Sequence, residues 1–108
     1  GFLYYLLGSV ASTYVAIMAP IEADKTYVVS GTWKRPEMSL YVNGAYIDTI
    51  DTATMLPGTL DSERIGCRNN NLQNFLDGEI SALLWYNLEL AWSDRIQVEN
   101  FLKNRFKV

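Results

Sequence analysis

The fold is decided by the stretch Ser39-Leu40-Tyr41-Val42-Asn43-Gly44-Ala45-Tyr46-Ile47-Asp48. Asn43-Gly44 tolerates the positive φ angles that both central residues of a type I′ turn require, and the flanking runs suit strands. The sequence therefore predicts an antiparallel hairpin over residues 38–42 and 45–50. A two-residue loop sets its register, which gives three opposed pairs: Val42 with Ala45, Tyr41 with Tyr46, and Leu40 with Ile47.

Alternation along the hairpin sorts its side chains into two faces. The face expected to meet the core holds four apolar residues: Leu40, Val42, Ala45 and Ile47. Tyr41 and Tyr46 then lie side by side on the opposite face, together with Ser39 and Asp48. We expect this second face to be partly wet, which makes the tyrosine pair a candidate ligand platform.

Three runs before the hairpin also read as strands, because they are rich in aromatic and β-branched residues. Residues 2–7 and 10–18 stand on either side of Gly8-Ser9, a pair that fits a type II′ turn, and Pro20 ends the second run. Residues 26–33 form the third run, which includes Trp33. A turn over residues 34–37 joins this run to the hairpin.

After the hairpin, the chain is predicted to hold a short strand, a polar loop, a central strand and a helix. Pro57-Gly58 marks a turn before a strand at residues 63–67, and the loop 68–74 follows. Residues 79–86 are nearly all apolar, as expected of a strand covered on both sides. Ser93 and Asp94 open a helix as its cap and its first-turn acid. An apolar stripe follows in that helix: Ile96, Val98, Phe101, Leu102 and Phe106.

Composition indicates one folded domain. The 108 residues are 49% hydrophobic with a net charge of -3, so the chain can bury a core and is not expected to bind nucleic acid. The basic cluster Lys103, Arg105 and Lys107 falls in the last turns of the expected helix, where cations complement the helix dipole. Residues 1–21 are uncharged but interrupted by small polar residues and Pro20, so we expect neither a membrane span nor a signal sequence.

The chemistry for catalysis or metal binding is sparse. Cys67 is the only cysteine and the chain has no His, so no internal disulfide or zinc site is expected, and the compartment stays open. The aspartates do not have the spacing of a calcium loop, so we assign no metal and no cofactor. The only Glu-x-Asp pattern, Glu22-Ala23-Asp24, precedes the Trp33 strand and is interpreted as a solvated turn rather than a catalytic carboxylate pair.

Several motifs follow one another in a recognisable order: Trp33, Leu40-Tyr41-Val42-Asn43-Gly44, Ile65-Gly66, Phe75-Leu76-Asp77-Gly78-Glu79-Ile80, Trp85-Tyr86-Asn87 and Ser93-Asp94. Over about residues 26–102, this order resembles the laminin-G-like, concanavalin A-like lectin and glucanase superfamily. The resemblance implies an all-β fold, an antiparallel β-sandwich of the jelly-roll type with one C-terminal helix, as a single domain over residues 1–108. Family helices often carry Glu where Ile96 stands, so the expected cap is weaker than usual.

A complete sandwich of this family is longer than the present chain. The strands that normally precede the Trp33 strand are represented only by residues 2–18. We therefore expect a sandwich that is incomplete at its N-terminal part and belongs to a longer protein. The resemblance alone favours an extracellular surface or a virion as its location.

The resemblance implies a non-catalytic binding module that recognises glycan or another surface ligand. Residue types that stack on sugar rings or bond their hydroxyls lie on the hairpin and in the polar loop. These candidate ligand-binding residues are Tyr41, Tyr46, Arg68, Asn69, Asn70, Asn71, Gln73 and Asn74. The alternative for each is an ordinary sheet or loop residue. Trp33, Trp85 and Trp92 are expected in the core or in helix packing rather than in a site.

Two other roles stay open from the sequence. One is a structural, assembly or decoration domain of a larger particle, fibre or surface layer, such as that of a virus or phage. The apolar residues 2–7 and 10–18 favour it, because their expected neighbouring strands are missing, and we expect self-association or a neighbouring chain there. The other role is a small enzyme or propeptide-like inhibitor, for which Glu22 or Asp24 would matter.

Overall fold

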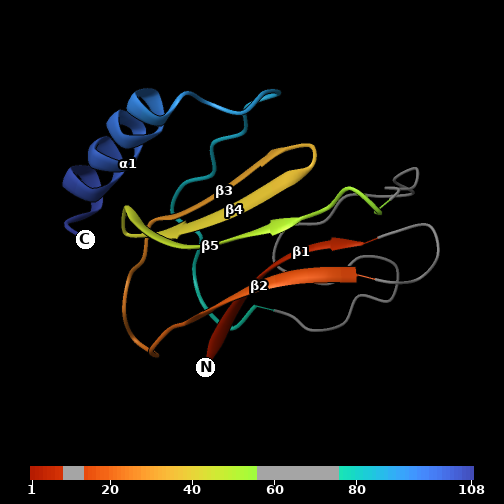
Figure 1. Cartoon of the computed structure of the whole chain (residues 1–108). Helices are drawn as coiled ribbons and strands as arrows, with labels where there is room; N and C mark the ends of the chain where they lie inside the picture. The colour runs from red at the N-terminus through yellow and green to blue at the C-terminus, as the bar shows by residue number, and fades with distance from the viewer. Residues whose placement is uncertain (9–13, 56–75) are drawn as a thin grey trace.

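The computed structural model describes residues 1–8, 14–55 and 76–108. Their elements, in chain order, are β1 (Phe2–Gly8), β2 (Tyr14–Pro20), β3 (Val29–Lys34), β4 (Glu37–Val42), β5 (Ala45–Asp51) and α1 (Trp92–Phe106). The strands form two antiparallel sheets, β1-β2 and β3-β4-β5 (Figure 1). This confirms the coarse prediction of β-sheets followed by one C-terminal helix. Among the described residues, no further strand closes the two sheets into a sandwich.

The β4–β5 hairpin forms around the predicted turn. Asn43 has φ 51 and Gly44 has φ 82, the left-handed pair that the Asn-Gly sequence favours. The Asn43 side chain adds a second reason for its position, because its Oδ1 accepts a hydrogen bond from the N–H of Val28 at 2.8 Å, while its own N–H donates to the Val28 carbonyl at 2.7 Å. The turn is thereby tied to the chain that enters β3.

The predicted hairpin register is correct beside the turn but wrong further along the strands. Tyr41 pairs with Tyr46 and Val42 with Ala45, as predicted. An irregularity between Leu40 and Tyr41 then shifts the strands by one residue, so Leu40 lies opposite Asp48 instead of Ile47. A bulge inserts one unpaired residue, which a sequence pattern does not reveal. Leu40 is still buried and Ile47 still packs on the core, but Ala45, next to the turn, is exposed.

β1 and β2 also form a hairpin, but not around Gly8-Ser9. Gly8 pairs with Tyr14, so the predicted two-residue turn is wrong, and residues 9–13 that join the strands lie outside the described part. The observed register opposes Leu7 to Val15 and Tyr5 to Ile17. These four residues belong to one face that packs on the core, and burial of that face fixes the register more strongly than the Gly-Ser pair does.

The two sheets face each other across a small core. Its fully buried members are Ile17 and Ala19 from β2 and Met38 and Leu40 from β4. Half-buried side chains surround them: Leu3, Tyr5, Leu7, Val15, Val42, Ile47 and Ile50. The core therefore draws on all strands except β3, and β2 and β4 supply its centre.

Residues 79–86 do not form the predicted central strand. The chain from residue 76 to α1 carries no strand or bridge, and it runs past both sheets as an extended trace (teal to cyan in Figure 1). Its apolar side chains are exposed up to Leu88, with Trp85 at 87%, and Leu90 is half-buried. The run has the residue types of a strand, but a strand also needs a neighbouring strand to pair with its backbone, and no described strand pairs with this run. The predicted turn at Pro57-Gly58 and the predicted strand at residues 63–67 lie outside the described residues.

The helix begins one residue earlier than its predicted cap. Ala91 is the N-cap, and no side chain caps the first turn, so the prediction of Ser93 as cap is wrong because Ser93 lies inside that turn. Asp94 in the first turn and Lys103 and Arg105 in the last are as predicted. Lys107 ends the helix with φ 56. Among the described residues, no helix has the length and apolar character that crossing a membrane demands.

The buried side of α1 is charged rather than apolar. Arg95 and Glu99 are its buried residues. Of the predicted apolar stripe, Ile96, Val98 and Leu102 are only half-buried, and Phe101 and Phe106 are exposed. Val98 and Leu102 lie on the same side of the helix as Arg95 and Glu99, so the hydrophobic pattern located the helix and part of its packed side but missed the charged pair there.

One close contact joins the two sheets at β3. A Cβ atom at Gly31 would lie 2.9 Å from two ring carbons of Tyr5, so glycine is required for the ring to reach the strand. Burial raises the pKa of the Tyr5 phenol, because the ionised form loses hydration there.

Gly31→Ala is expected to lower the free energy of unfolding by about 1–3 kcal/mol, the usual range for an overpacked contact. Urea denaturation measures it. Tyr5→Leu removes the ring, so Gly31→Ala in that background should cost much less, and the double-mutant cycle should show coupling. Equal costs in the two backgrounds would mean that the ring and the glycine are not in contact.

Candidate functional site

The predicted pair, Tyr41 and Tyr46, exists on the face of the β4–β5 hairpin that is turned away from the core, here called the tyrosine face. The ring centroids of Tyr41 and Tyr46 lie 5.8 Å apart with an interplanar angle of 61°, an edge-to-face arrangement that favours both rings. Tyr46 is 59% exposed, whereas Tyr41 is half-buried. Only one of the two rings is therefore open to a ligand.

Tyr41 is covered by α1. The guanidinium carbon of Arg95 lies 3.5 Å from the centroid of the Tyr41 ring, a cation–π contact in a largely desolvated position. Arg95 Nη1 in turn donates to Glu99 Oε1 at 2.6 Å, and both side chains are buried. The helix thus rests on the tyrosine face through a charged pair rather than through apolar side chains.

Sequence reasoning missed Arg95 and Glu99. Their spacing of four residues on a helix is the one available signal, and opposite charges at that spacing usually mark an exposed surface pair. The position of the hairpin beneath the helix, with Tyr41 under Arg95 and Gly44 close to Glu99, makes the pair a buried one.

The helix is also held to the tip of the hairpin. Lys103 Nζ donates to the carbonyl of Asn43 at 3.3 Å. Glu99 Oε2 lies close to the turn, since a Cβ atom at Gly44 would be 3.4 Å from it. Figure 1 shows α1 beside this end of β4 and β5. Together with Arg95, these contacts fix the edge of the tyrosine face.

A line of hydroxyl groups runs beside the exposed ring of Tyr46. The Tyr46 hydroxyl donates to Thr49 Oγ1 at 3.1 Å, and Thr49 Oγ1 lies 2.7 Å from Ser39 Oγ. The exposed Asp48 carboxylate accepts from the N–H of Thr49 at 2.8 Å. An aromatic face next to hydroxyl and carboxylate groups can stack on an apolar surface and bond polar groups at its edge.

The remaining predicted ligand-binding residues lie outside the described part of the chain. These are Arg68, Asn69, Asn70, Asn71, Gln73 and Asn74. Their place relative to the tyrosine face stays a prediction.

A concave region lies between β3 and the extended segment. This open groove of about 1330 Å³ is lined by β3, by residues 21–28 and by residues 76–90, with further walls from β1 and α1. Trp33 lies on its β3 side, and its indole N–H donates to Thr52 Oγ1 at 3.1 Å. The expectation that the three tryptophans lie in the core or in helix packing is wrong, since Trp33, Trp85 and Trp92 are all exposed.

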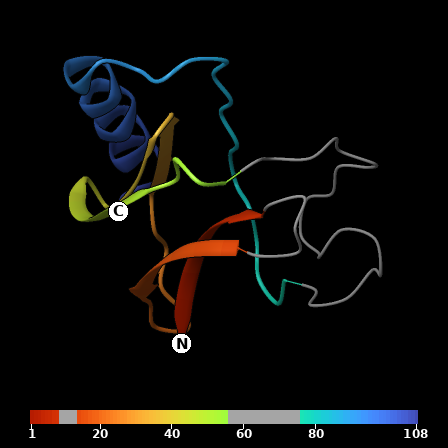
Figure 2. The same cartoon turned by 45° about the vertical axis from the view of Figure 1, so that its right-hand side comes forward.

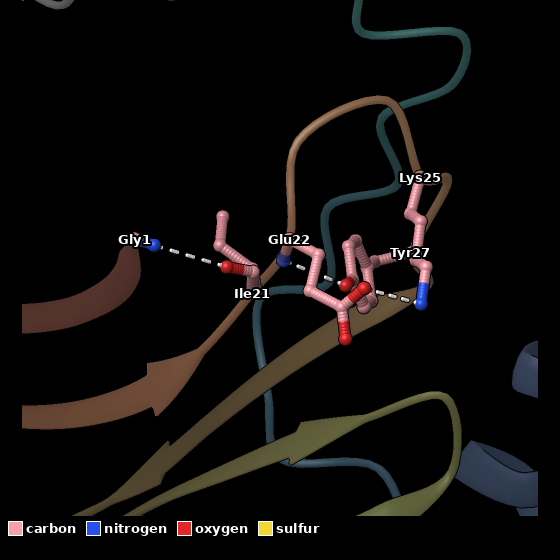
Figure 3. A network of polar contacts seen from close by, with 5 residues as sticks. All are labelled: Gly1, Ile21, Glu22, Lys25 and Tyr27. Carbon is pink, nitrogen blue, oxygen red and sulfur yellow. Dashed lines mark hydrogen bonds and ion pairs between the residues drawn. The ribbon is translucent and has the colours of Figure 1, made fainter.

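One end of the groove is bordered by a polar network (Figure 3). Glu22 pairs with Lys25 at 2.5 Å, and its N–H donates to the Tyr27 hydroxyl at 2.9 Å. The Gly1 ammonium donates to the Ile21 carbonyl at 3.2 Å. Glu22 and Asp24 lie in an exposed turn, as predicted. In residues 1–8, 14–55 and 76–108, no cluster of three acidic, Cys or His side chains could hold a metal ion.

Comparison with known protein families matches residues 3–94 to the model described as the Concanavalin A-like lectin/glucanases superfamily. The match covers five of the six described elements and the start of α1. No curated protein and no solved structure matches the chain.

Removal of either partner of the Arg95–Glu99 pair is expected to be costly, because the other charge stays buried and unpaired. Arg95→Met or Glu99→Leu alone should each lower the free energy of unfolding by about 3–5 kcal/mol, and the double variant should recover much of that loss. Chemical denaturation measures all three.

Lys25→Met serves as the matched control, since it breaks the exposed Lys25–Glu22 pair. It should cost about 0–1 kcal/mol. If Glu99→Leu costs no more than Lys25→Met, the pair on α1 is not buried in solution.

Proposed function

The chain belongs to the concanavalin A-like lectin/glucanase superfamily, and on that premise we propose that it is a non-catalytic binding module that recognises glycan in the manner of a lectin. Laminin-G-like domains are generally non-catalytic. The proposal includes the fold: the two facing sheets are taken as the described part of a jelly-roll sandwich. The ligand surface is the tyrosine face of β4 and β5, extended by the polar residues of 68–74.

The observation that carries the proposal is the exposed Tyr46 ring beside its row of hydroxyls. A pyranose presents an apolar face that stacks on an aromatic ring and a rim of hydroxyls that bond polar side chains. The hydroxyls of Tyr46 and Ser39 both lie within hydrogen-bonding distance of Thr49 Oγ1, and the Asp48 carboxylate accepts from the N–H of Thr49. The Tyr46 ring meets the Tyr41 ring edge to face, and Tyr41 is itself held by Arg95, so little freedom is lost when a ligand binds.

The geometry gives no comparable support to catalysis. A glycosidase needs two carboxyl groups that flank the scissile bond. Glu22 is engaged with Lys25 in an exposed turn, and Asp48 accepts a backbone hydrogen bond within its own strand. The proposed role therefore depends on recognition alone.

A role in assembly is the second candidate, as a structural or decoration domain of a larger particle, fibre or surface layer. The supporting observation is the amount of apolar surface on the described residues, above all Leu83, Trp85, Leu88 and Trp92. Soluble monomers rarely expose large contiguous apolar patches. Sedimentation at increasing concentration tests this role, and a chain that stays monomeric throughout argues against self-assembly.

Tyr46→Ala is expected to weaken glycan binding about tenfold or more, which corresponds to about 1.4 kcal/mol of lost stacking. A glycan array would identify the ligand, and calorimetry on the best glycan would measure the change. Tyr46→Phe keeps the ring and should lose much less.

Tyr86→Ala is the matched control, because Tyr86 is also exposed, at 46%, but lies on the extended segment. It should bind as the unchanged chain does. Absence of binding to every glycan by folded protein, or equal losses for Tyr46→Ala and Tyr86→Ala, would contradict the proposed site.

A further inference from the structure

The β1-β2 hairpin has a second apolar face, turned away from the core. Its members are Phe2, Tyr4, Leu6, Tyr14 and Met18, each between 51% and 68% exposed. The register sets Tyr4 opposite Met18 and Phe2 opposite Pro20, so these side chains share one surface, here called the outer face. Figure 2 shows this hairpin at the end of the molecule away from α1.

The outer face differs from the solvent side of an ordinary antiparallel sheet. Such a sheet alternates apolar residues inside with polar residues outside. β1 and β2 carry no charged residue in either strand, and their apolar residues occupy both faces. This is the pattern of a hairpin that is covered on both sides, although the core covers only one.

The size of the outer face fits a protein contact. Aromatic side chains bury about 150–250 Å² each, and slightly more than half of each of the five side chains is exposed. Covering them would remove on the order of 500–600 Å² from each of two copies, or about 1,100 Å² in all, which lies at the lower limit for a specific interface.

We propose that the outer face of β1-β2 is the contact of a two-fold symmetric dimer of this chain. A two-fold contact sets the same surface against itself, and a face without charges meets its own copy without like-charge repulsion. The seven paired positions of β1 and β2 make it a regular surface. Phe, Tyr and Met are also enriched at interfaces, and the hydroxyls of Tyr4 and Tyr14 can stay at the wet rim.

The other exposed apolar surfaces suit a second copy less well. Arg105 follows Phe101 by four residues and so lies beside it on the surface of α1, and self-pairing there brings cations together. The segment of residues 76–91 has no strand or helix to give it a fixed shape. The inference deepens the assembly role, and it is independent of glycan binding because the tyrosine face lies on the other sheet.

Sedimentation equilibrium of the full chain and its variants tests the dimer. The unchanged chain should dimerise with a dissociation constant of micromolar order, as expected of a small interface. Leu6→Lys with Met18→Lys should raise that constant by at least about a hundredfold, since two desolvated charges per copy oppose the contact. The neutral pair Leu6→Gln with Met18→Gln is the second variant, in case the lysines disturb folding.

Phe101→Lys is the matched control, with a similarly exposed apolar residue replaced on α1, and it should leave the dimer unchanged. Circular dichroism confirms that each variant is folded. If the unchanged chain is monomeric, both the proposed dimer and the self-assembly role are wrong. Association that persists in folded outer-face variants overturns this contact while leaving the assembly role in place, and a complex of a monomeric chain with a different protein also overturns it.

Discussion

The packing of β2 against β4 is the constraint on which the rest of the described structure depends. Ile17 and Ala19 meet Met38 and Leu40 in the one cluster of fully buried side chains that the described residues of the two sheets form. That contact sets the register of β1 on β2, because the residues that face the core must line up. It also decides which faces stay outside: the tyrosine face of β4 and β5 on one side and the outer face of β1 and β2 on the other.

The two outside faces differ in what covers them. The tyrosine face receives α1, which is held by the buried Arg95–Glu99 pair and by Lys103 on the hairpin tip. That leaves one open ring, Tyr46, with polar neighbours, a surface suited to a polar ligand. The outer face receives no described element and has no polar side chain beyond its tyrosine hydroxyls, a surface suited to a second copy of the chain. The proposed recognition and assembly roles therefore use separate surfaces.

Local signals predicted the features that depend on neighbouring residues. The Asn43-Gly44 hairpin and the Tyr41–Tyr46 pair could be read from the sequence because the turn geometry fixes them. The β1-β2 register, the shift at Leu40 and the open course of residues 79–86 could not, since each depends on which distant surface is available for packing or hydrogen bonding. Arg95 and Glu99 were missed for the same reason: their spacing suits an exposed pair, and burial arises because the β4–β5 hairpin lies beneath them.

We expect stability to be concentrated around β2 and β4, with residues 79–86 outside any sheet. Native-state hydrogen exchange tests it most directly, because protection reports how much of the structure must open to free each amide. The account predicts the slowest exchange across β4, which pairs with a strand on both sides, and rapid exchange throughout residues 79–86. Exchange at residues 79–86 as slow as that of β4 would contradict it, since the segment would then be a paired strand of a sheet.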